Sequence, residues 1–193
     1  TSERDRHLSG TAGMALTLLR HTTPDVAPGI CYGRTDLDVV DTFAEEATCV
    51  VASLPRIDRI FSSPLMRCAS LADFVGEHTG LSPIRDERLI EMDFGRWEMQ
   101  PWGDLPRHEL DAWANDFLDA RPHGGESVAE LTARTRAAIS DLNIPDTHTL
   151  IVTHAGVIKA AFAALGGDHH YRSTVSYGGH VTLLEHRPRS APS

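Results

Sequence analysis

The sequence predicts an α/β fold, a three-layer α/β/α arrangement with a central, mostly parallel sheet and a helical and loop insertion over the active-site edge. Short apolar runs at 15–19, 57–61 and 149–153 predict strands that are buried on both faces. Each run ends abruptly in polar or basic residues, and helical patterns separate the runs. Open α/β sheets bind ligands just beyond the carboxyl ends of their strands, so the residues after these runs are candidates for a site.

The length predicts one domain with an insertion rather than two full domains. The 193 residues are 41% hydrophobic and 23% charged, which is ordinary for a globular protein. We expect a single domain over 14–186. Residues 1–13 are polar and aperiodic, and we interpret them as a disordered leader or as residues added before a native start at Met14. A short tail is expected over 187–193.

Charge and cysteine content argue against several classes of function. A net charge of −9 disfavours nucleic-acid and anionic-membrane surfaces, which need basic patches. No apolar run is long enough to span a bilayer, and the three scattered cysteines predict reduced thiols in a cytoplasmic protein. The eleven histidines are mostly isolated, and the side chains of the adjacent His169 and His170 would diverge on any regular element. We therefore expect no metal site and no cofactor. The oligomeric state stays open, a homodimer included.

The first strand ends in Arg20 and His21, and a loop over 22–36 follows it. Prolines and glycines make this loop irregular, and loops of such length usually have a function. It must lie over the strand end that carries His21. Tyr32 and Arg34 in the loop, and Thr22 at its start, are therefore expected to line a substrate pocket. A helix is predicted from Asp41 to Leu54, because apolar residues recur there at helical spacing.

The second strand, 57–61, is followed by a helix whose start is predicted at Ser63, as N-cap, with Pro64 in the first helical position. This helix is expected to run to Gly80. Arg67 then falls in the first turn, where a cation opposes the helix dipole. It is either an exposed arginine or the counter-charge of an anion bound at the helix start.

Residues 88–125 predict an insertion that contains all three tryptophans and shapes the pocket. One helix around Trp113 is expected to face the main body through Leu110, Trp113, Ala114, Phe117 and Leu118. Glu91 lies at the entrance of the insertion among apolar neighbours. A carboxyl group partly shielded from water is suited to donating a proton near neutral pH, although an exposed glutamate at a strand edge is the alternative.

The cleanest helix of the chain is predicted over 127–142. Ser127 and Glu130 form a capping-box pattern at its start, and Glu126 just before it is a candidate to face the pocket. The third strand, 149–153, then ends in His154, and a helix follows from about Val157 to Leu165. Residues 174–185 alternate enough to predict an edge strand or a hairpin.

If these strand ends converge, the residues they carry suit phosphoryl transfer. Arg20 and Arg67 offer forked donors that match phosphate oxygens and remain charged. His21 offers a nitrogen nucleophile, and His154 can donate to a phosphoryl oxygen. Glu91 can protonate the leaving oxygen and then activate water. None of these steps requires a metal, since the arginines neutralise the phosphate.

The chain resembles the histidine phosphatase superfamily, also called phosphoglycerate-mutase-like, over nearly all of 14–186. Each matched motif is weak alone, but all occur in the family's order and at about its spacing. The matches are Arg20-His21, residues 62–67 with Arg67, residues 89–91 with Glu91 followed by 94–98, residues 125–127, and residues 152–156 with His154. The sequence departs from the family where Thr22 and Met99 replace usual glycines, and Thr22 puts the turn beside His21 in question.

The resemblance implies a phosphatase of small phosphorylated metabolites that needs no metal. His21 would form a phosphohistidine, Glu91 would donate the proton, and Arg20, Arg67 and His154 would hold the phosphoryl group. The segment 20–36 is most similar to the α-ribazole phosphatase branch, which dephosphorylates a nucleotide-loop precursor in cobalamin synthesis. The alternatives are a mutase that returns the phosphoryl group to its substrate and a non-catalytic member that binds phosphorylated ligands.

Overall fold

A computed structural model describes residues 14–164 and 174–185. Its centre is a five-stranded sheet in the order β3-β2-β4-β1-β5. The strands are β1 (Met14–Arg20), β2 (Arg59–Ser62), β3 (Ile84–Arg85), β4 (His148–Thr153) and β5 (His180–Glu185). β1, β4, β2 and β3 are parallel, and β5 pairs antiparallel with β1 as an edge strand. The predicted mostly parallel sheet is confirmed, with the two-residue strand β3 as an addition.

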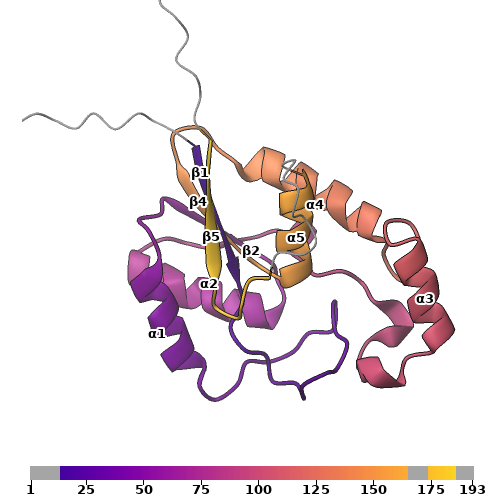
Figure 1. Cartoon of the computed structure of the whole chain (residues 1–193). Coiled ribbons are helices and arrows are strands. Elements are labelled where there is room, and N and C mark those ends of the chain that lie inside the picture. The colour runs from indigo at the N-terminus through magenta and orange to yellow at the C-terminus, as the bar shows by residue number, and fades with distance from the viewer. Residues whose placement is uncertain (1–13, 165–173, 186–193) are drawn as a thin grey trace, which may run out of the picture.

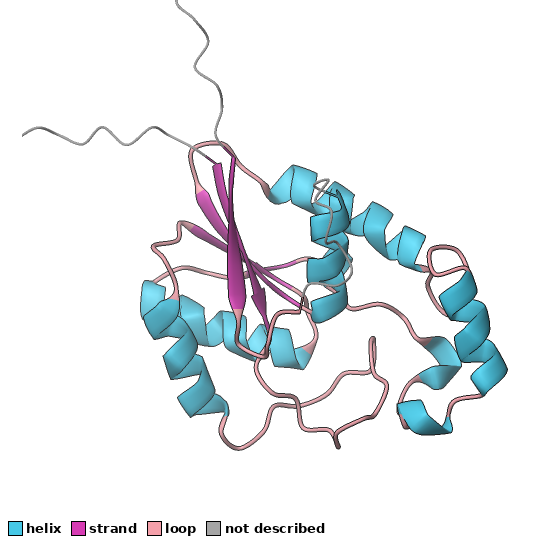
Figure 2. Cartoon of the chain, viewed as in Figure 1, coloured by secondary structure: helices cyan, strands magenta, loops and turns pink. Residues whose placement is uncertain are grey.

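Helices cover both faces of the sheet, as Figures 1 and 2 show. α1 (Phe43–Ser53) and α2 (Met66–Thr79) pack on one face, and α4 (Val128–Leu142) and α5 (Ala155–Ala164) pack on the other. Neighbouring residues of one strand serve opposite faces: Leu19 packs with α1 and α2, whereas Leu18 packs with α4 and α5. This alternation explains why both faces of the strands are apolar in the sequence. The three-layer prediction is confirmed.

The start of α2 differs from the prediction. α2 begins at Met66 with Leu65 as its N-cap residue, whose side chain makes no cap hydrogen bond. The Asp36 carboxylate from the loop accepts the Met66 N–H instead, at 2.7 Å. Ser63 lies two residues before the N-cap position, and its buried hydroxyl group forms hydrogen bonds with His154 Nε2 at 2.9 Å and with the Leu65 N–H at 3.3 Å. Arg67 still lies in the first turn, and the helix ends as predicted at Gly80, whose φ of 75° is left-handed.

The predicted capping box of α4 is present. The Ser127 hydroxyl accepts a hydrogen bond from the Glu130 backbone N–H, and the Glu130 carboxylate accepts one from the Ser127 N–H. The face predicted from helical spacing is buried against the sheet and α5, and it comprises Val128, Leu131, Thr135, Ala138 and Leu142.

The segment 88–125 contains two 3₁₀ turns, Gly95–Trp97 and Trp102–Asp104, and the helix α3 (Arg107–Asn115). A further 3₁₀ turn, Glu87–Leu89, leads into it. Trp97 is buried with Cys31 and Leu105, so the segment packs against the loop 22–36. Trp113 and Phe117 pack towards Met92 and towards Val128 and Val157, which lie at the starts of α4 and α5.

Part of the prediction for α3 is wrong. The helix ends at Asn115, before Phe117, and both Ala114 and Leu118 are exposed instead of facing the main body. Asp116 leaves the helical conformation with a φ of −134°, so helical spacing no longer applies to the residues after it. No described helix is long and apolar enough to cross a membrane. The segments 1–13 and 187–193, His169 and His170, and Leu165 lie outside the described residues.

Met99, where the related family usually has glycine, has a left-handed backbone with a φ of 63°. This conformation costs a residue with a Cβ atom roughly 1–2 kcal/mol, whereas glycine adopts it freely. Met99 is 49% exposed, so its side chain contributes little packing. Its backbone N–H donates to the Cys31 carbonyl at 2.7 Å and so holds the conformation in place.

We expect Met99→Gly to be more stable than Met99→Ala by about 0.5–1 kcal/mol, after subtraction of the larger chain entropy of glycine in the unfolded state. Urea unfolding of the two variants measures the difference, and Met99→Ala controls for loss of the methionine side chain. Equal midpoints for both variants would contradict a strained backbone at this position.

Candidate active site

The parallel register brings the predicted site residues together. β1 and β4 pair with Arg20 opposite Thr153, so the next residues, His21 and His154, are neighbours beyond the sheet. Their ring centroids are 5.2 Å apart. The His21 N–H donates to the Thr153 carbonyl at 3.0 Å, which extends the ladder by one residue and fixes this arrangement.

The ring of His21 is oriented by its own backbone. Nδ1 lies 2.7 Å from the carbonyl oxygen of Thr22, and since a carbonyl can only accept, Nδ1 carries the proton. Nε2 of the neutral ring then keeps its lone pair. Burial and the charges of Arg67 and Arg20 lower the pKa of His21 to about 3, although the bond to Thr22 acts in the opposite direction. His21 is therefore neutral near pH 7 and has a free nitrogen.

His154 is fully buried beside Ser63 and Cys68, whose hydroxyl and thiol groups lie 2.9 and 3.4 Å from its Nε2. Burial, followed by the nearby His21 and Arg67, lowers the pKa of His154 well below its usual value. Two neutral imidazoles in contact avoid the repulsion that two imidazolium ions would have.

Arg67 is completely buried, so its charge acts within the protein and not in solvent. Its two terminal nitrogens donate to the carbonyls of Thr35 and Gly33 at 2.8 and 2.6 Å. It is therefore not the exposed arginine that was the alternative. Through these bonds Arg67 also fixes the loop 22–36 above the strand ends.

Buried donors without a partner gather in this region. Among the described residues, the side-chain atoms that are buried without a hydrogen bond include Arg20 Nε, Arg67 Nε and Thr22 Oγ1. Unpaired buried donors are costly, and a ligand with several acceptor oxygens would satisfy them. Thr22 has no left-handed φ, so its backbone conformation does not require the glycine that is usual in the related family.

Glu91 is held by backbone N–H groups. One carboxylate oxygen accepts from Met92 N–H and the other from Gly156 N–H, both at 2.9 Å, the latter at the start of α5. A Cβ atom on Gly156 would lie 2.2 Å from Glu91 Oε1, so only glycine at this position leaves room for the carboxylate. Each carboxylate oxygen retains a second lone pair for a proton. The side chain is 8% exposed, so it is not the exposed strand-edge glutamate of the alternative interpretation.

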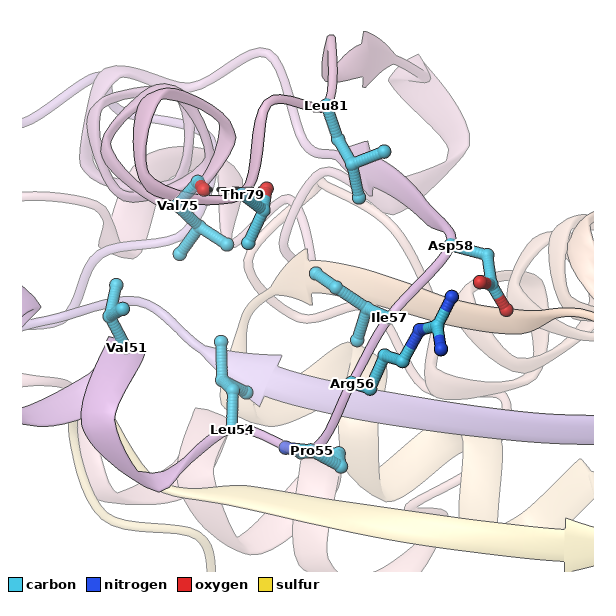
Figure 3. A pocket seen from close by; sticks show the side chains of 9 residues that line it. All are labelled: Val51, Leu54, Pro55, Arg56, Ile57, Asp58, Val75, Thr79 and Leu81. Atoms are coloured by element: carbon cyan, nitrogen blue, oxygen red, sulfur yellow. Dashed lines mark hydrogen bonds between the residues drawn. The ribbon is translucent and has the colours of Figure 1, made fainter.

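A cavity of about 640 Å³ opens above these residues. Arg20, His21 and Glu91 line it, together with Tyr32 and most of residues 23–30 of the loop, and Trp102 of the segment 88–125. Arg67 and His154 are fully buried and are not among the residues that line it. The loop therefore covers the strand end, as the sequence predicted. Another cavity, of about 500 Å³, lies beside the amino end of β2 and is lined mostly by apolar side chains such as Val51 and Leu81 (Figure 3). It contains none of the predicted site residues.

Of the four predicted pocket residues, only Tyr32 lines the cavity. Thr22 is fully buried and does not line it, and two others lie elsewhere. Arg34 is exposed and does not line the cavity, because its backbone N–H binds Glu98 and its side chain extends from the loop surface. Glu126 forms a two-pronged ion pair with Arg134, at 2.6 and 2.8 Å, instead of facing the pocket. Arg134 also donates to the carbonyls of Arg88, Ile90 and Glu91. Glu126 therefore supports the backbone at Glu91 indirectly, by holding Arg134 in place.

Sequence reasoning missed Tyr177. Its ring covers the Arg20 guanidinium at 4.0 Å and lies 5.5 Å from the His21 ring. Its hydroxyl group forms a 2.7 Å hydrogen bond with that of Tyr32, whose ring lies 5.4 Å from the Arg67 guanidinium. An aromatic pair thus faces the two arginines. The alternating pattern of residues 174–185 predicted Tyr177 only as a strand residue, and nothing in the sequence indicated a contact with Tyr32.

No group of three or more His, Cys, Asp or Glu side chains in the described part of the chain is arranged to hold a metal ion. The arrangement instead combines a neutral imidazole with a free nitrogen, two guanidinium groups and an oriented carboxyl group. Such a set can bind a phosphoryl group, attack it and protonate a leaving oxygen.

Comparisons with known proteins agree with this chemistry. The model of the histidine phosphatase superfamily (branch 1) matches residues 16–190. A glucosyl-3-phosphoglycerate phosphatase of Mycobacterium tuberculosis is 33% identical over 78% of this chain and 74% of its own. An adenosylcobalamin/alpha-ribazole phosphatase of Salmonella typhimurium is 31% identical over 79% of each chain. The structure of a mycobacterial glucosyl-3-phosphoglycerate phosphatase superposes with a TM-score of 0.76 and 26% identity, over 90% of this chain and 91% of that one.

The burial of His21 predicts a pH dependence of stability. The unfolded chain binds a proton at His21 near pH 6.5, but the folded protein does so only near pH 3. The unfolded state thus holds more protons between these values, and the free energy of unfolding falls as the pH drops through this window. Protonation of His21 changes the free energy of unfolding by at most about 1.4 kcal/mol per pH unit.

Urea unfolding of the wild type and of His21→Gln between pH 7.5 and 4.5 measures this contribution. We expect the free energy of unfolding of the wild type to fall, relative to that of His21→Gln, as the pH is lowered. The same substitution at the exposed His108 is the matched control. A difference that does not change with pH would show that folding does not lower the pKa of His21.

Proposed function

Because the chain belongs to the histidine phosphatase superfamily, we propose that it is a metal-independent phosphomonoesterase that acts through a phosphohistidine at His21. The observation that carries the proposal is the hydrogen bond from His21 Nδ1 to the Thr22 carbonyl, with the pKa lowered to about 3 by burial. Together they give a neutral ring with Nε2 free at physiological pH. The relatives are named as phosphatases of small phosphorylated metabolites, which supports the same reaction class.

In the first step, His21 Nε2 attacks the phosphorus atom and the bond from phosphorus to the alcohol oxygen breaks. Arg20, Arg67 and His154 hold the phosphoryl oxygens, and the unpaired Nε atoms of both arginines are donors available for them. Glu91 gives its proton to the leaving oxygen. In the second step, the Glu91 carboxylate removes a proton from water, which attacks the phosphohistidine and releases inorganic phosphate.

For the alcohol, we propose α-ribazole, so that the substrate is α-ribazole 5′-phosphate and the role lies in cobalamin synthesis. Two observations support it: the similarity of residues 20–36 to that branch, and the Salmonella relative of nearly equal extent. The mycobacterial relative makes glucosyl-3-phosphoglycerate the main competing substrate. The domain organisation that we propose is a single catalytic unit over 14–186, with the segment 88–125 as one wall of the pocket.

The test is release of phosphate from a panel that contains α-ribazole 5′-phosphate, glucosyl-3-phosphoglycerate and 3-phosphoglycerate, with a chelator present. We expect chelator-resistant hydrolysis, an acid-labile and base-stable phosphoryl label on the quenched enzyme, and at least a thousandfold loss in His21→Ala. Undiminished turnover in His21→Ala, or loss of activity with the chelator, would overturn the mechanism.

The same panel separates the other candidate functions. Conversion of 3-phosphoglycerate to 2-phosphoglycerate faster than release of phosphate would identify a mutase. Binding of phosphate without hydrolysis of any ester would identify a non-catalytic member. We favour hydrolysis, because the oriented Glu91 and the free Nε2 of His21 supply both steps of the reaction.

The Glu91 carboxyl group gives a second prediction. We expect Glu91→Gln to lower kcat on an alkyl phosphate by about a hundredfold or more, because the amide cannot donate the proton. Gly156→Ala should lower kcat by about ten- to a hundredfold, since its Cβ atom would displace the carboxylate. Gly103→Ala, where a Cβ atom meets nothing within 4 Å, is the matched control. If Gly156→Ala were as active as Gly103→Ala, the position of Glu91 would not matter for catalysis.

A further inference from the structure

The cavity of about 640 Å³ that His21 lines, the first cavity, adjoins a smaller cavity, the second cavity. It has a volume of about 320 Å³, within the range of small-molecule sites. Glu91 and Lys159 line both cavities, so the two meet at these side chains. The rest of the wall is mostly apolar and includes Met92, Phe94, Trp113, Phe117, Val128 and Leu131.

Lys159 is the single lysine among the 193 residues. It lies one turn after Gly156 on α5, on the helix face that carries the bond to Glu91. The side chain is half-buried and makes no ion pair or hydrogen bond to another residue of the described part of the chain. A partly buried ammonium group needs acceptors, and here a ligand can supply them.

The direction of the substrate follows from the proposed function, on which this inference rests. The leaving oxygen must lie at Glu91, because Glu91 protonates it. The alcohol part therefore begins where the two cavities meet. The phosphoryl group lies at Arg20 and His21 in the first cavity, and the second cavity offers three aromatic side chains and one unpaired cation.

We propose that the second cavity binds the alcohol part of the substrate, and that this part is an apolar ring system with a hydrogen-bond acceptor that Lys159 holds. The Trp113 ring in the wall supports a planar group, since ring faces and edges pack well together. Lys159 is then a specificity residue: it selects among phosphomonoesters by the group they carry beyond the scissile bond. Small phosphorylated alcohols without a ring leave this cavity unused.

The test compares kcat/KM of the full-length protein for ethyl, benzyl, 4-pyridylmethyl and 4-carboxybenzyl phosphate. We expect benzyl phosphate to exceed ethyl phosphate at least tenfold, because the ring is removed from water. The two esters with an acceptor should exceed benzyl phosphate about three- to tenfold. Lys159→Met should bring the ratio of the acceptor esters to benzyl phosphate close to one, and Lys159→Arg should largely keep it.

The matched control is Arg136→Met, which removes the same charge from an exposed site on α4 and should keep the wild-type ratio. Equal turnover of ethyl and benzyl phosphate would overturn the ring site. An unchanged ratio in Lys159→Met would overturn the role of Lys159. Failure of the proposed function is distinct, because the wild type would then release phosphate from none of the four esters. The same ratios, read as dissociation constants by calorimetry, would still decide the assignment of Lys159.

Discussion

The parallel pairing of β1, β4 and β2 is the constraint on which the site depends. Each strand stops at the same edge of the sheet, and the residue that follows it is held by one more backbone bond to its neighbour. Thus His21 N–H binds the Thr153 carbonyl and Ser63 N–H binds the Val152 carbonyl, both at 3.0 Å. The imidazole, hydroxyl and guanidinium groups converge because the sheet register places them, before any side-chain contact is made.

The carboxyl group is supplied from outside the sheet and needs its own support. Arg134 on α4 donates to the carbonyls of Arg88, Ile90 and Glu91, and the Glu126 carboxylate accepts from Arg134. Gly156 then admits the carboxylate to the start of α5. A helix packed on one face of the sheet and the segment 88–125 are thereby connected at the group that we assign to proton transfer.

Sequence reasoning could predict what the chain order encodes. Buried strands ending in Arg20 and His21, or in His154, identify one edge of the sheet, and the capping box locates α4. It could not predict Tyr177 or Lys159, because their importance comes from residues distant in the sequence that fold next to them. The same limit explains Glu126: a carboxylate before a helix can face a pocket or an arginine eight residues later, and only the packing decides between them. Residue preferences at Ser63 and Pro64 favoured a helix start there, but the helix starts after Leu65, where Asp36 from the distant loop accepts the first N–H.

Glu98 has a mechanical consequence for the rim of the pocket. Its carboxylate accepts the backbone N–H groups of Arg34 and Thr35 from the loop 22–36, the Thr35 hydroxyl, and the N–H of Phe94 from the segment 88–125. Burial raises the pKa of Glu98, but these hydrogen bonds outweigh it and the pKa is lowered, so the carboxylate stays ionised and the joint stays closed near neutral pH. Glu98 therefore joins the loop 22–36 and the segment 88–125, the two walls of the pocket, into one rigid unit. Separating these two walls would require breaking the bonds to Glu98, whereas Tyr177 on the facing side is joined to the loop by one hydrogen bond between its hydroxyl group and that of Tyr32.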